Sequence, residues 1–133
     1  MKIIIKTTNL DLTPSLKDYA EKKIGELEKF IQRIKEKGQD FEKGKPSYEA
    51  WMELERTTRH HHKGKVFRAE CQIRLPGRSL RSESVKEDIY LAIDEVKDEL
   101  QREVDQYKQK QVSRYKRMAR RMKNFLRFFT PRD

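Results

Sequence analysis

Apolar and polar residues recur along this chain with two different periods, and these periods predict most of its secondary structure. Alternation with a period of two over residues 2–7, 50–57, 65–75 and 80–85 predicts four β-strands, because neighbouring side chains of a strand point to opposite faces. Apolar residues at spacings of three and four over residues 16–34 predict an amphipathic helix, since those spacings bring side chains to one side.

Local signals locate the ends of this helix and the start of a second one. Thr13 suits an N-cap and Pro14 the first helical position, and Gly38 is expected to end the helix. Ser84 and Glu87 form a capping-box pattern, which predicts that a second helix starts there. Apolar residues keep a helical spacing, weakly, almost to the end of the chain. The second helix can therefore continue past the folded domain, given a partner that covers its apolar side.

The predicted order is strand, helix, three strands and helix, with a loop at residues 38–48. Two amphipathic helices each need an apolar surface to cover, and one face of a sheet provides it. We therefore predict an α+β fold, β-α-β-β-β-α, in which a four-stranded sheet carries two helices packed on one face. The other face should meet water, with Arg68 and Arg74 beside Glu70, whereas Cys71 is expected to be a buried, unreactive thiol. Aromatic residues expected in or beside the core are Tyr19, Trp51 and Tyr90.

Charge is distributed unevenly along the chain. The 133 residues include 32 Lys and Arg and 22 Asp and Glu, which gives a formal net charge of +10. Residues 1–105 hold 22 basic and 21 acidic side chains, whereas residues 106–133 hold 10 basic side chains and one acidic side chain. Such a run of like charge marks an interaction segment, and a polyanion is its natural partner. We therefore divide the chain into a domain at residues 1–110 and a basic, aromatic, helical tail at residues 111–133.

Cysteine content, hydropathy and motifs narrow the class of protein. One cysteine cannot form an internal disulfide, and no apolar run is long enough for a transmembrane helix or a signal peptide. The cytoplasm is therefore the expected compartment. The sequence has no phosphate-binding glycine loop and no motif of a serine or zinc hydrolase. We expect a protein that is not an enzyme and that uses no cofactor and no small-molecule substrate.

The basic run at the end of the chain is the main candidate for RNA contact. Arginine and lysine bind phosphates, and the aromatic residues interleaved with them can stack on unpaired bases. The same pattern also suits a helix that packs on another protein or one that lies on a membrane surface. RNA is the preferred partner, and no membrane contact is expected. The predicted RNA contacts in this run are Arg102, Lys108, Lys110, Arg114 and Arg117.

Two further groups of cations are candidates for RNA contact. One lies mainly on the polar side of the first helix, where acidic neighbours also offer ion pairs, and consists of Lys17, Lys22, Lys23 and Lys29. The other is an expected hairpin tip with Arg59, His61 and Lys63. The hairpin has three consecutive histidines, but adjacent side chains of an extended segment point to opposite faces. We therefore expect no metal site there.

Four stretches of the chain resemble the family of ribosome hibernation-promoting factors and ribosome-associated inhibitors. They are residues 10–13 with 16–23, Pro76-Gly77 with residues 87–94, the basic hairpin at 59–63, and Arg102 with Lys108 and Lys110. The sequence Asp-Ile-Tyr-Leu-Ala-Ile-Asp at residues 88–94, about ten residues after Pro-Gly, is the most specific of them. Together they follow the expected order over most of residues 2–110.

The resemblance implies a fold similar to double-stranded RNA-binding domains and a site on the rRNA of the small ribosomal subunit. The site is the channel used by messenger RNA and the anticodon ends of transfer RNA, so a bound factor would inhibit translation during starvation or other stress. The tail does not resemble the dimerisation domain of the long form of the family. Whether ribosomes are silenced singly or paired through dimerisation is left open. The alternative is a general binder of structured RNA without preference for the ribosome.

Overall fold

The protein has one layer of strands and one layer of helices. The computed structural model describes residues 1–36, 48–57, 66–75 and 77–129, of which residues 33–36 and 129 are described by their backbone alone. The elements are β1 (Lys2–Thr8), α1 (Pro14–Gly25), α2 (Glu28–Glu36), β2 (Glu49–Arg56), β3 (Phe67–Leu75), β4 (Arg78–Lys86) and α3 (Ile89–Phe129). Almost all of the loop predicted at 38–48 lies outside the described residues, as does the predicted hairpin tip.

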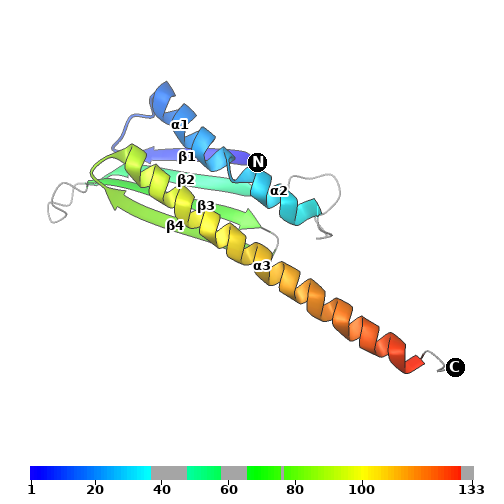
Figure 1. Cartoon of the computed structure of the whole chain (residues 1–133). Coiled ribbons are helices and arrows are strands. Elements are labelled where there is room, and N and C mark those ends of the chain that lie inside the picture. The colour runs from blue at the N-terminus through cyan, green and yellow to red at the C-terminus, as the bar shows by residue number, and fades with distance from the viewer. Residues whose placement is uncertain (37–47, 58–65, 76, 130–133) are drawn as a thin grey trace.

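The described strands form a four-stranded mixed sheet in the order β1-β2-β3-β4. β1 runs parallel to β2, whereas β3 is antiparallel to both β2 and β4. A parallel pair needs a crossover connection, and α1 and α2 lie in it. The helices cover one face of the sheet and leave the other open (Figure 1). The predicted α+β fold, with helices on one face of a four-stranded sheet, is confirmed.

The core lies between the sheet and the helices. The inward-facing residues of β2 and β3 include Met52, Leu54 and Ile73, none of which is more than 2% exposed. Cys71 is on the same face and is fully buried, and this burial raises the pKa of its thiol to about 12. Because the thiolate is the reactive form, the prediction of an unreactive thiol is supported.

The first predicted helix is two helices, so the prediction of one continuous helix is wrong. α1 ends at Gly25 and α2 begins at Glu28. Between them, the backbone N–H of Leu27 donates to the carbonyl of Ile24 at 3.0 Å, a tighter turn than that of an α-helix. Ile24 before this turn, Leu27 within it and Ile31 after it are all fully buried. The apolar spacing of three and four residues continues through this turn, which is why the pattern indicated one helix.

The predicted start of the last helix is also wrong. Ser84 belongs to β4 and is buried on its inward face, as is Ser82. Helix α3 begins at Ile89, where a carboxylate oxygen of Asp88 accepts a hydrogen bond from the backbone N–H of Tyr90 at 2.8 Å. The residues of the capping-box pattern therefore belong to the end of β4 and the turn after it, and Asp88 caps the helix instead of Ser84.

Helix α3 extends well beyond the sheet. It has 41 residues, which corresponds to roughly 60 Å at 1.5 Å per residue. Figure 1 shows it crossing the sheet and continuing straight to the C-terminal end. Buried side chains recur from Ile89 to Tyr107, whereas none is buried among residues 108–128. We call residues 89–107 the packed half of α3 and residues 108–129 its projecting half.

Candidate nucleic-acid interface

The projecting half of α3 carries the densest positive charge of the described residues. Residues 108–129 contain nine Lys and Arg and no Asp or Glu. All of these cations are exposed except Lys108, which is half-buried. Lys110, Arg114 and Arg117 are three or four residues apart and line one hollow of the surface together with Ser113. Three of the predicted RNA contacts therefore lie together on one side of the helix.

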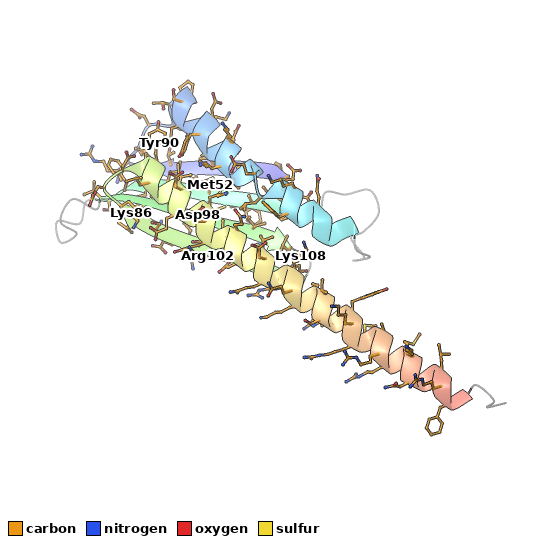
Figure 2. All side chains as sticks on the ribbon, in the orientation of Figure 1. Met52, Lys86, Tyr90, Asp98, Arg102 and Lys108 are labelled. Carbon is orange, nitrogen blue, oxygen red and sulfur yellow. The ribbon has the colours of Figure 1, made fainter. Side chains whose placement is uncertain are left out.

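Arg102 lies in different surroundings from the other predicted contacts of α3. The packed half has six acidic and two basic side chains. Arg102 lines a hollow with Lys86 and with the carboxylates of Asp94, Glu95, Asp98 and Glu99. Figure 2 shows Arg102 on the part of α3 that crosses the sheet and Lys108 near the point where the helix leaves it. Carboxylates around Arg102 compete with phosphate for its guanidinium group.

Helix α1 presents Lys17 and Lys22 to solvent. The helix begins as predicted: Thr13 Oγ1 accepts a hydrogen bond from the backbone N–H of Leu16 at 3.2 Å, and Pro14 follows the cap. Leu16 starts the buried side of the helix, which holds α1 on the sheet. Lys17 and Lys22 are exposed, so both can reach a phosphate.

Lys23 is part of a contact between α1 and α3. Its Nζ lies 3.7 Å from Asp94 Oδ1 and 5.6 Å from the ring centroid of Tyr19. The Tyr19 hydroxyl donates to Asp94, and this hydrogen bond is the main reason why the pKa of Tyr19 rises to about 12. The Tyr19 ring also packs edge-on against Tyr90, with centroids 4.9 Å apart. Lys23 therefore helps to join two helices, and its charge is partly neutralised.

The remaining predicted contacts divide between α2 and the hairpin. Lys29 is exposed on α2, and its Nζ lies 5.2 Å from the Phe30 ring centroid. The hairpin residues Arg59, His61 and Lys63, with the other histidines, lie outside the described residues. Within the described ranges, no group of three or more His, Cys, Asp or Glu side chains could hold a metal ion. None of the helices in those ranges is long and apolar enough to cross a membrane.

The open face of the sheet has charges of both signs that pair with one another. Arg68 contacts Glu83 at 2.7 Å, Glu55 at 3.4 Å and also Glu70, and Arg81 contacts Glu70 at 2.7 Å. The hydrogen bond from Arg68 lowers the pKa of Glu83, and the same bond raises the pKa of Arg68. The prediction that this face meets water is confirmed. Its paired arginines make it a weaker phosphate-binding surface than the projecting half of α3.

Trp51 lies on this open face rather than in the core. It is half-buried, and the guanidinium carbon of Arg74 lies 4.4 Å from its ring centroid. Ile4, which is 39% exposed, lines the same shallow hollow as Trp51. The sequence offered a signal for this position, since Ala50 and Met52 on either side both point inward. The sequence did not predict this surface feature, in which the guanidinium group of Arg74 covers the Trp51 ring.

Comparison with known proteins finds relatives over most of the chain. The family model described as Sigma 54 modulation protein / S30EA ribosomal protein matches residues 3–112. A ribosome hibernation promoting factor of Azotobacter vinelandii is 31% identical over 114 residues, which cover 86% of this chain and 89% of the relative. A ribosome hibernation promotion factor of Bacillus subtilis is 31% identical over 110 residues, which cover 83% of this chain and 50% of the relative.

Solved structures show the same architecture. The N-terminal domain of Protein Y from Thermus thermophilus is 32% identical, with a TM-score of 0.60, and the match covers 80% of this chain and 99% of that one. A ribosomal subunit interface protein from Coxiella burnetii is 18% identical, with a TM-score of 0.56 over 81% of this chain and 98% of that one, and supports the fold alone. Most of the projecting half lies beyond the end of the family match.

Proposed function

The chain belongs to the sigma 54 modulation protein / S30EA ribosomal protein family, and from this premise we propose that it binds small-subunit rRNA and keeps idle ribosomes inactive. Its relatives are named for ribosome hibernation, so association with ribosomes and inhibition of translation are the activity of the family. The proposed site is the channel of messenger RNA and the anticodon ends of transfer RNA. A folded domain in that channel excludes both ligands without any chemical reaction.

The observation that carries this proposal is the projecting half of α3. It holds nine exposed or half-exposed cations and no acid, whereas residues 1–105 are almost neutral. RNA attracts such a segment because each neutralised phosphate releases a bound counterion. The shape of folded RNA, rather than its sequence, then determines where the domain fits. We propose that residues 1–110 fill the channel and that residues 111–133 extend along neighbouring RNA.

The proposed contacts differ in how well they are placed. Lys110, Arg114 and Arg117 share one side of the projecting half and are the best placed of the proposed rRNA contacts. Lys23 and Arg102 stand last, because Lys23 is paired with Asp94 and several carboxylates line the same hollow as Arg102. The full proposed set is Lys17, Lys22, Lys23, Lys29, Arg59, His61, Lys63, Arg102, Lys108, Lys110, Arg114 and Arg117. The expected compartment is the cytoplasm, where ribosomes are found.

The second candidate is a general binder of structured RNA. The projecting half favours it, because an exposed run of cations binds any RNA through the phosphates alone. The two candidates differ in whether the folded domain adds affinity for one particular groove. A preference for the ribosome therefore separates them.

Sedimentation with purified ribosomal particles tests the proposal. The full chain is mixed with small subunits, or with a generic RNA duplex that presents the same concentration of phosphate, at the same salt concentration. We expect the chain to sediment with the small subunit at salt concentrations that release it from the duplex. Equal affinity for both would support the general RNA binder. A second gradient, run with intact ribosomes, distinguishes single ribosomes from pairs.

A control with messenger RNA tests the location. Small subunits loaded with messenger RNA and an initiator transfer RNA should bind the chain more weakly than empty subunits. Undiminished binding to the loaded subunits would exclude the channel as the site, even if the chain binds ribosomes.

A further inference from the structure

A band of apolar side chains runs along the projecting half of α3. Tyr115, Met118 and Met122 are 70%, 66% and 61% exposed. At 3.6 residues per turn, Met118 lies about five full turns after Leu100, and Met122 about five full turns after Val104. Leu100 and Val104 are fully buried in the core beneath the packed half. Met118 and Met122 therefore lie on the same side of α3 as the buried residues Leu100 and Val104, about 27 Å further along the helix axis and beyond the sheet.

The band is broad, and the cations lie mainly outside it. Val112 and Ala119 flank Tyr115 and Met118 on one side, which widens the band beyond the narrow seam of a two-stranded coiled coil. A helix with this pattern normally lies on a folded protein surface. Lys116 and Arg120 project from the opposite side, roughly half a turn away from Met118 and Met122. The projecting half thus has one apolar side and one cationic side.

Three occupants fit this band poorly. A second copy of the projecting half would bring nine further cations and no acid against the first nine, so like charges would repel. A flat lipid surface that touched Met118 and Met122 along the helix would meet the sheet, because these residues continue the side of α3 that packs on the sheet. Figure 1 shows the sheet beside the packed half of α3. RNA can stack a base on the Tyr115 ring, but Met118 and Met122 have no ring to stack, so RNA matches only part of the band.

A groove in a protein fits the band better. Methionine is unbranched and flexible and adapts to apolar grooves, and amphipathic helices commonly bind in them. The cations that border the band and are not among the proposed rRNA contacts, Arg121 and Lys123, favour a partner whose rim is acidic. We infer that the projecting half is a helix that docks its apolar band into an acidic-rimmed apolar groove of a protein on the small ribosomal subunit, while its opposite side faces rRNA. The identity of the particle rests on the proposed function.

Two matched double variants of the full chain test this inference with purified small subunits. The first is Met118→Gln with Met122→Gln, and the second is Lys116→Gln with Arg120→Gln. Each pair is four residues apart, and glutamine is about as good a helix former as the residues that it replaces. We expect the methionine variant to bind about tenfold more weakly or worse at every salt concentration, with an unchanged salt dependence. The cation variant should instead show a shallower salt dependence.

The control for folding is the unfolding transition, which should be the same in both variants because all four side chains are exposed. A methionine variant that binds small subunits as tightly as the unchanged chain would overturn the inference and leave the proposed function intact. Failure of the unchanged chain to bind small subunits at low salt would overturn both.

Photocrosslinking identifies what each side of the helix touches. Benzoylphenylalanine is placed at Met122 in one preparation and at Arg120 in another, and each is irradiated on purified small subunits. We expect position 122 to crosslink to a ribosomal protein and position 120 to crosslink to rRNA. Crosslinks from position 122 only to rRNA, or only to a second copy of the chain, would contradict the docking of the band in a protein groove. Binding to phosphatidylglycerol vesicles that the methionine variant loses, with its subunit binding unchanged, would assign the band to lipid instead.

Discussion

The packed and projecting halves of α3 share one helix and one apolar spacing but differ in burial and in charge. Leu100 and Val104 are fully buried, whereas Met118 and Met122, about five turns further along, are 66% and 61% exposed. The packed half has six acids and two cations, and the projecting half has nine cations and no acid. The same period can therefore build a core or an interaction surface, depending on whether a sheet lies opposite.

The largest expected difference between the halves is in stability. Leu100→Ala should lower the free energy of unfolding by about 2–5 kcal/mol, because it removes a fully buried side chain and leaves a cavity. Met118→Ala should change it by less than about 0.5 kcal/mol, since the side chain is exposed and alanine favours the helix. Urea denaturation followed by circular dichroism measures both values. Equal losses in the two variants would mean that the projecting half is packed on the domain.

A smaller effect is expected at the contact between α1 and the packed half. Tyr19→Phe removes the hydrogen bond to Asp94 and should cost about 1 kcal/mol of unfolding free energy at neutral pH. Because the pKa of Tyr19 is raised from 10.0 to about 12, its contribution is present below pH 10 and is lost as the pH rises through 12. The difference in stability between the unchanged chain and Tyr19→Phe should therefore shrink over that range.

This variant also sharpens the comparison of the two halves. Its contact involves only the packed half, so the salt dependence of RNA binding by the projecting half should not change. An ultraviolet titration should lose a tyrosine with a pKa of about 12 in Tyr19→Phe. A difference in stability that stays constant from pH 9 to pH 12 would show that the Tyr19 hydroxyl does not make the bond to Asp94.

The fold was largely predictable because its signals are local and periodic. Alternation located the strands, and Thr13 with Pro14 located the start of α1. The turn between α1 and α2 was not predictable, because Leu27 keeps the helical spacing while the chain changes direction. The position of Ser84 was not predictable for a related reason. A Ser-x-x-Glu sequence can be a helix cap or part of a strand, and here Ser84 lies on the inward face of β4.

The candidate site was predictable only where it does not depend on tertiary contacts. The cations of the projecting half are close in sequence and lie on one helix, so composition alone revealed them. The pairing of Lys23 with Asp94 was hidden, because the two residues are far apart in sequence and meet only through the packing of α1 on α3. The arrangement of Arg74 over Trp51 was hidden as well, because it depends on the pairing of β2 with β3.

The projecting half is expected to bind RNA phosphates while the packed half holds the domain together. Affinity for small subunits is measured over a range of salt concentrations for the full chain and for a variant with Arg114, Lys116, Arg117 and Arg120 replaced by Gln. If each cation contacts one phosphate, the slope of log affinity against log salt should become shallower by roughly 3, at about 0.7–0.9 per phosphate. The unfolding free energy should stay the same. Equal slopes for the two proteins would contradict the claim.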